Sequence, residues 1–100
     1  SGTTVEENNP FKKNTMELMP VYPNPFNAAT VVSFTLPSEG KIHLALYDIL
    51  GKEVDQISDE TYTAGTHSFY YRPKNLATGV YFLKLRADNQ SKTQKMMYLK

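Results

Sequence analysis

The chain of 100 residues contains no cysteine and no tryptophan. The absence of cysteine excludes disulfides, thiol catalysis and zinc sites built on cysteine ligands. Side-chain packing alone therefore has to stabilise the fold. The absence of tryptophan removes the aromatic residue that stacks most strongly on sugars, although seven tyrosines remain.

An excess of charge of either sign is also missing, because 11 basic side chains are matched by 10 acidic ones. Without a basic run, the sequence lacks the electrostatic footprint of a nucleic-acid-binding protein. No apolar stretch approaches the roughly 18 residues that a membrane-spanning helix needs, so we expect no membrane insertion. If the domain is exported, we expect its export signal to lie upstream, in a longer parent chain.

Apolar periodicity divides the chain into two parts. Residues 1–15 are polar and show no periodicity, so we expect a linker or leader there, and residues 16–100 form the domain. Within the domain, apolar and polar residues alternate with a period of two, which is typical of half-buried β-strands. The strands are expected at 18–22, 30–36, 41–46, 53–57, 66–71, 80–87 and 92–99.

Turn signals separate these strands at intervals of roughly 8–12 residues. This spacing predicts an all-β domain, an immunoglobulin-like or fibronectin-III-like sandwich of about seven antiparallel strands. A small barrel is the competing geometry. The residues expected in the core between the sheets are Val32, Phe34, Leu44, Leu46, Phe69, Tyr81, Leu83 and Leu85.

The sequence offers little that could carry chemistry. His43 and His67 fall on different strands, and no metal-binding or phosphate-binding motif is present. His67 lies on the apolar face of its strand, where we expect a partly buried histidine with a local hydrogen bond. Carboxylates cluster only at predicted turns, without the fixed separation that acid–base catalysis needs. We therefore expect no catalytic residue, no metal and no cofactor, with a weak calcium site or a tyrosine-based sugar site as alternatives.

One segment, residues 22–27, packs two prolines, two asparagines and two aromatic residues into six positions. Each proline fixes its own φ and favours an extended conformation in the preceding residue. We expect a stiff, non-hydrogen-bonded corner between the first two strands, pinned by its aromatic side chains. On these residues alone, the corner can simply shape the fold.

Six motifs, this corner included, follow one another in order. They read Tyr-Pro-Asn-Pro-Phe-Asn at 22–27, Val-Ser-Phe-Thr-Leu-Pro at 32–37, Leu-Tyr-Asp-Ile-Leu-Gly-Lys-Glu-Val at 46–54, Ala-Gly-Thr-His at 64–67, Leu-Ala-Thr-Gly-Val-Tyr at 76–81 and Lys-Met-Met-Tyr-Leu-Lys at 95–100. The series covers about residues 16–100. It resembles the C-terminal sorting domains (type A) of the type IX (Por) secretion system of Gram-negative bacteria. It is also similar to the Ig-like domain of flagellar hook-capping proteins.

The sorting-domain resemblance implies a non-catalytic C-terminal domain that directs a secreted parent protein across the outer membrane. The parent would pass through the periplasm to the cell surface or the medium. The implied partners are the outer-membrane secretion machinery, an upstream catalytic or adhesive domain of the same chain, and in many cases a sortase-like peptidase. The alternatives are a structural spacer or assembly module of hook-capping type and an accessory carbohydrate-binding module. The Tyr-Pro-Asn-Pro-Phe-Asn form departs from the shorter Pro-x-Pro-x-Asp/Asn version common among sorting domains. It is closer to the subgroup of sorting domains that overlaps with the hook-capping type, and this departure bears on cleavage and anchoring more than on the fold.

An Ig-like module can present an exposed corner, its turns and its final strand to a partner. The residues expected to serve partner recognition are Pro23, Asn24, Pro25, Phe26 and Asn27 in the corner, Gly79 and Tyr81 in the fifth motif, and Lys95 and Lys100 around the last strand.

Overall fold

The computed structural model describes residues 16–88 and 90–100, so the linker expected at 1–15 lies outside the described residues. Within them, no helix is long and apolar enough to cross a membrane. The strands are β1 (Glu17–Leu18), β2 (Thr30–Leu36), β3 (Gly40–Tyr47), β4 (Glu53–Tyr62), β5 (Gly65–Tyr71), β6 (Gly79–Ala87) and β7 (Gln90–Tyr98).

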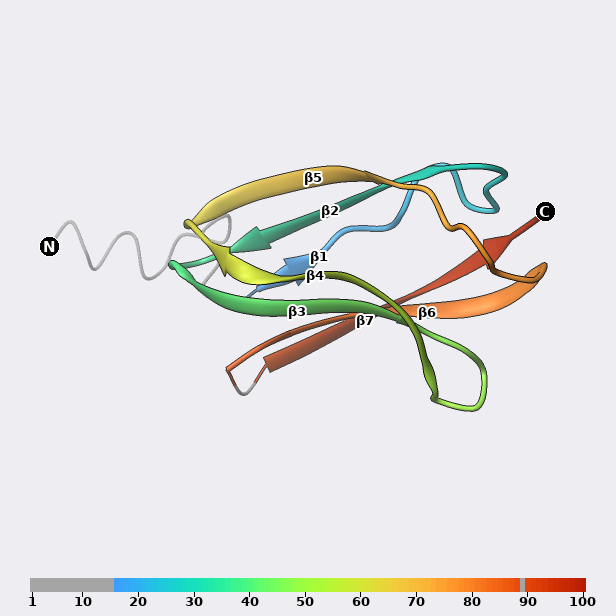
Figure 1. Ribbon diagram of the computed structural model, residues 1–100. Helices are drawn as coiled ribbons and strands as arrows, with labels where there is room; N and C mark the ends of the chain where they lie inside the picture. The colour runs from blue at the N-terminus through green and yellow to red at the C-terminus, as the bar shows by residue number, and fades with distance from the viewer. Residues whose placement is uncertain (1–15, 89) are drawn as a thin grey trace, which may run out of the picture.

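The strands form two antiparallel sheets that lie face to face (Figure 1). One sheet has three strands in the order β1-β2-β5, and the other has four in the order β4-β3-β6-β7. The prediction of an all-β, Ig-like sandwich of about seven antiparallel strands is confirmed. Two separate sheets also distinguish the fold from the competing barrel.

The core lies between the sheets and follows the period-two pattern of the sequence. In β2, buried residues at Val32, Phe34 and Leu36 alternate with half-buried ones. Seven of the eight predicted core residues are buried, and the eighth, Phe69, is half-buried. Its strand, β5, is an edge of the three-stranded sheet, so one flank of the ring has no neighbouring strand to cover it. Each fully buried large apolar side chain contributes about 1.5–3 kcal/mol.

The first predicted strand, 18–22, is shorter than expected, because β1 contains only Glu17 and Leu18. The amide of Met19 still donates to a carbonyl of β2, but Pro20 has no amide hydrogen and ends the ladder. Pairing resumes only at Tyr22, which forms an isolated bridge with Val31.

Strand β4 is longer than the predicted 53–57, because it pairs with β3 as far as Tyr62. The ladder shifts register twice, between Leu44 and Ala45 and between Leu46 and Tyr47. Each such bulge reverses which side of the strand faces the core. The period-two pattern of β4 is therefore broken, and its true length was not visible in the sequence.

His67 matches its expected environment. Its side chain is half-buried, and Nε2 lies 2.9 Å from the carbonyl oxygen of Thr63. The imidazole packs against the rings of Phe34 and Tyr62, with centroids 5.4 and 5.0 Å away. These contacts give His67 a structural role in the sandwich.

Candidate functional site

Three connections and the residues after β7 lie together at one end of the sandwich (Figure 1). We call this the corner end, and it consists of residues 19–29, 48–52, 72–78 and 99–100. The antiparallel order of the strands places these segments there, because every second connection returns to the same end. The residues predicted for partner recognition lie in these segments or in the adjoining strands β6 and β7.

The corner pairs with the outer edge of β7. The Phe26 amide donates to the Met97 carbonyl at 2.9 Å, and the Leu99 amide donates to the Phe26 carbonyl at 2.9 Å. Phe26 and Tyr98 thereby form a parallel bridge. The expectation of a non-hydrogen-bonded corner is wrong, since the prolines remove only their own amides and the amide of Phe26 remains free to pair.

The corner asparagines extend this pairing. Asn24 accepts from the Met97 amide at 2.9 Å through Oδ1 and donates to the Lys95 carbonyl at 3.1 Å through Nδ2. Asn27 donates through Nδ2 to the Leu99 carbonyl at 2.8 Å. The Asn24 side chain thus presents both a donor and an acceptor to β7, as the backbone of a neighbouring strand does.

The Phe26 ring is buried inside the sandwich, with 1% of its surface exposed. Its centroid lies 5.0 Å from that of Tyr98 and 6.5 Å from that of Tyr71. Thr30 closes the corner from behind by donating to the carbonyl of Pro23 at 2.8 Å. Phe26 therefore positions the corner, and its ring is not available to a partner.

Tyr81 is also buried, and its hydroxyl donates to the Ala77 carbonyl at 2.7 Å. A tyrosine near the start of the sixth strand that bonds back to the backbone a few residues upstream is the tyrosine corner of Ig-type sandwiches. Gly79 pairs in register with Tyr98 at the beginning of β6. Both residues hold the end of the domain together.

Lys100 is tied to the same region, because its amide donates to the hydroxyl of Thr78 at 2.8 Å. The predicted recognition residues thus fall into an inner group and an exposed group. The inner group consists of Phe26 and Tyr81, which are buried, and Gly79, which is half-buried. The exposed group consists of Pro23, Asn24, Pro25, Asn27, Lys95 and Lys100.

The sequence predicts a turn between β3 and β4 at Leu50-Gly51, but not that two large aliphatic side chains are exposed on it. Asp48 Oδ1 accepts hydrogen bonds from the amides of Leu50 at 2.9 Å and Lys52 at 3.0 Å, and Gly51 adopts a positive φ of 86°. This fixed turn holds Ile49 and Leu50 in solvent, 70% and 87% exposed. The signal was an aspartate followed three residues later by glycine, a turn signature with two large aliphatic residues inside it.

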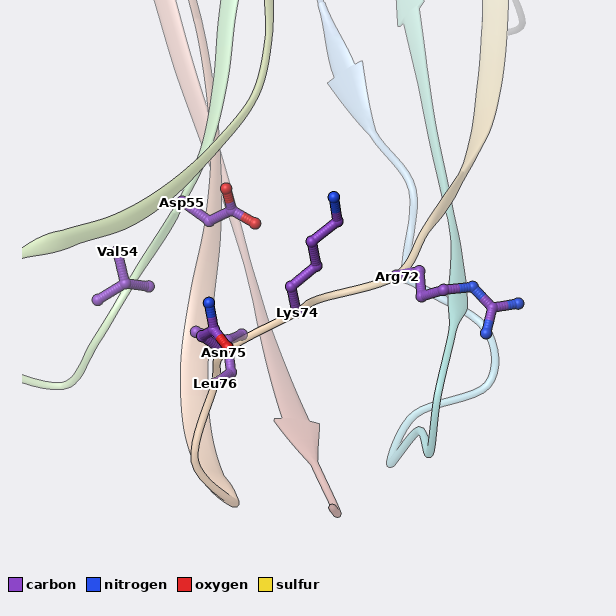
Figure 2. Close-up of a pocket in the computed structure, with 6 residues that line it drawn as sticks. All are labelled: Val54, Asp55, Arg72, Lys74, Asn75 and Leu76. Atoms are coloured by element: carbon purple, nitrogen blue, oxygen red, sulfur yellow. The ribbon is translucent and has the colours of Figure 1, made fainter.

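A pocket of about 370 Å³ lies between the start of β4 and the connection 72–78 (Figure 2). Its lining residues are Val54, Asp55, Arg72, Lys74, Asn75 and Leu76. Figure 2 shows the Arg72 side chain directed away from the others. The pocket offers one carboxylate and two cations, but no nucleophile beside a base.

Asp55 has a structural partner at this pocket. It accepts a hydrogen bond of 2.6 Å from the hydroxyl of Tyr71, which is 6% exposed. Burial, together with that hydrogen bond, raises the pKa of Tyr71 well above its usual range. Across residues 16–88 and 90–100, no three acidic or histidine side chains gather where they could hold a metal ion.

Comparison with known proteins identifies the class to which this architecture belongs. The family model described as "Secretion system C-terminal sorting domain" matches residues 20–99, most of the chain. The chain therefore belongs to the family of type IX secretion system C-terminal sorting domains, and the resemblance seen in the six motifs is confirmed. Searches of curated proteins and of solved structures gave no match.

Membership assigns the domain a general role as a sorting signal in type IX secretion. That role implies interaction with the secretion machinery and export to the cell surface or the medium of a Gram-negative bacterium. A sorting-domain family is a class of signals and not of catalysts.

Proposed function

We propose that the outer-membrane secretion machinery recognises this domain at its corner end, and that recognition directs an upstream catalytic or adhesive region across the outer membrane. The observation that carries the proposal is the pairing of the corner with the last strand. Five hydrogen bonds join Asn24, Phe26 and Asn27 to residues 95–99. Two motifs that are far apart in the sequence thereby form one continuous surface to which a partner can bind.

Positive charge surrounds this surface. Arg72, Lys74, Lys95 and Lys100 are all exposed, and the ion pairs found within the described ranges involve none of them. Such unpaired cations favour a partner that presents acidic groups, because complementary charge raises the rate of encounter and fixes orientation. We infer that Lys95 and Lys100 contact the partner through their side chains, while their backbone groups hold the fold.

In this proposal the domain performs no chemistry of its own. The tyrosine corner and the hydrogen-bonded corner asparagines stabilise the fold and fix the shape of this end. If a sortase-like peptidase removes the domain after export, the peptidase supplies the catalytic groups, and the domain supplies the substrate.

The proposal is tested by fusing residues 16–100 to a periplasmic reporter in a host with the type IX machinery. We expect the reporter to reach the surface or medium, and to stay periplasmic when the outer-membrane translocon is deleted. A fusion that stays periplasmic in the competent host contradicts the sorting role and favours the spacer alternative.

Substitutions are better suited than truncation to test the surface itself. Removing residues 95–100 would also remove Met96 and Tyr98, which are buried, so loss of export could reflect unfolding. The double variant Lys95→Glu/Lys100→Glu reverses two exposed charges and is expected to reduce export. The matched control is Lys41→Glu/Lys92→Glu, two exposed lysines away from the corner end. Equal export of both variants would overturn recognition at the corner end while leaving the sorting role intact.

A further inference from the structure

The outer face of the three-stranded sheet carries a row of two tyrosines and a valine. Tyr22 and Val31 exchange backbone hydrogen bonds of 3.3 and 2.8 Å, and Val31 pairs in register with Tyr70 on β5. Residues directly opposite one another on antiparallel strands place their side chains on the same face. The next residue, Val32, is fully buried, so the row of Tyr22, Val31 and Tyr70 faces away from the core.

Both tyrosines are unusually accessible, with Tyr22 78% and Tyr70 82% exposed. They flank Val31 on opposite sides of β2, Tyr22 through its isolated bridge and Tyr70 on β5, so their backbones are about 9–10 Å apart. A shallow depression of about 210 Å³ lies beside Tyr70, lined also by Val31, Ser68 and Phe69. Neither ring contributes to the core, so the fold does not account for their presence.

The neighbouring rows of this face carry hydroxyl groups. Ser33 and Ser68 lie 2.8 Å apart between their oxygens, and Thr35 and Thr66 lie 3.0 Å apart. The face thus has three rows of paired residues, which cross β2 at Val31, Ser33 and Thr35. Among the residues paired in these rows, Glu17, which lies opposite Thr35, is the one that carries a charge. The face is thus flat, rich in hydroxyl groups and nearly free of charge.

We propose that this face binds a neutral, extended, β-linked polysaccharide. The C–H groups of a pyranose ring carry partial positive charge and pack on the negative face of an aromatic ring. In an extended β-1,4-linked chain, every second sugar presents the same face. The distance between two such sugars is about the distance between the positions of Tyr22 and Tyr70. Tyr22 and Tyr70 would each hold one such sugar, and the serine and threonine hydroxyls would bond to the sugar hydroxyls.

The composition of the face favours this ligand over the other candidates. A nucleic acid or an acidic glycan needs cations, and the three rows contain none. A protein partner normally covers about 800 Å² with an apolar centre, whereas two rings and one valine offer a small, flat apolar area. Binding here goes beyond the sorting role and does not depend on it. Tyr22 lies in a corner-end segment, but Val31 and Tyr70 lie on β2 and β5, and the hydrogen bonds that carry the sorting proposal involve other corner residues.

The test is a depletion isotherm of the 100-residue protein on microcrystalline cellulose, a neutral β-1,4-glucan, with titration of its soluble hexasaccharide as a second measurement. We expect saturable binding to cellulose. Tyr22→Ala and Tyr70→Ala should each weaken it about tenfold or more, because each variant loses both the apolar area of a ring and its stacking on a sugar. Tyr70→Phe should bind like the parent, because it keeps the ring. Leu50→Ala, which removes an equally exposed apolar side chain elsewhere, is the control.

Melting temperatures of all variants establish that each is folded. Absence of binding to cellulose and to the hexasaccharide would overturn the proposal, and so would equal binding by the alanine variants and the parent. Impaired export of Tyr70→Ala, whose position lies outside the corner end, without any glycan binding would assign the face to a protein partner. Because export of the reporter is a separate readout, failure of glycan binding leaves the sorting proposal untouched.

Discussion

The rings of Phe26 and Tyr98 pack with their centroids 5.0 Å apart, and the same two residues form the parallel bridge between the corner and β7. Both side chains are buried, at 1% and 8% exposure. The corner and the last strand therefore stabilise one another through packing as well as through hydrogen bonds. A substitution in either segment is therefore expected to change the free energy of unfolding of the whole domain.

Phe26→Ala should be strongly destabilising. The substitution empties a buried site between Tyr98 and Tyr71, and such a change costs about 3–5 kcal/mol, a large part of a small domain's stability. The free energy of unfolding, measured with urea and circular dichroism, checks this. Leu50→Ala, at an 87% exposed position, should change it by no more than about 0.5 kcal/mol. A Phe26→Ala protein as stable as the parent would contradict the packing described for the corner.

Asn24→Ala should cost about 1–2 kcal/mol, because two hydrogen bonds to β7 are lost and each is worth about 0.5–1.5 kcal/mol. The amides and carbonyls of β7 regain water, which keeps the cost moderate. Asn75→Ala is the matched control, since Asn75 is an exposed asparagine at the same end. Urea midpoints that are equal for the two variants would refute the strand-like role of Asn24.

Tyr71→Phe should lower stability at neutral pH by about 1–2 kcal/mol, because the hydrogen bond to Asp55 is lost. The deficit should shrink above about pH 10. There the unfolded chain ionises Tyr71, while burial raises the pKa of the folded tyrosine and keeps its proton bound. The folded state then holds more protons than the unfolded one, so the parent loses stability as the pH rises and Tyr71→Phe escapes this loss. Unfolding free energies at pH 7 and pH 11 check the sign, and a deficit that grows with pH would contradict it.

The sequence predicted the regular strands well, for a physical reason. Over 30–36 and 80–87 one face packs on the core and the other meets solvent, so alternation survives in the sequence. The prediction of strand bounds failed for β4, where two bulges break the alternation, and for the first strand, which Pro20 interrupts. Phe69 was placed on the correct face, but its position on an edge strand depends on topology that the pattern does not encode.

The sequence placed a corner at 22–27, between the first two strands, but did not predict its interactions. The partners of Asn24 and Asn27 are backbone atoms of β7, and no local pattern reveals contacts across more than 70 residues of chain. Ile49 and Leu50 escaped notice because large aliphatic residues are ordinarily assigned to a core. Only the turn fixed by Asp48 shows that they are held in solvent.

That exposure leads to a further prediction, for the double variant Ile49→Ser/Leu50→Ser. Both side chains lie at the corner end on a turn that is already ordered, so little entropy is lost when a partner covers them. Adjacent large apolar residues that are exposed together form a patch of the kind that marks interaction sites. We expect the double variant to fold with an unfolding free energy within about 0.5 kcal/mol of the parent. In the reporter fusion, we expect export to fall markedly.

The turn can contribute in two ways, through its apolar side chains and through its fixed conformation. Asp48→Ala separates them, because it keeps both apolar side chains and removes the acceptor of the Leu50 and Lys52 amides. Its export should fall less than that of the double variant, since the same side chains are still present but have to be ordered on binding. Measuring the exported fraction of the reporter alongside unfolding by urea distinguishes a lost contact from a lost fold. Export at the parent's level by Ile49→Ser/Leu50→Ser would remove this turn from the recognition surface and confine recognition to the corner and the last strand.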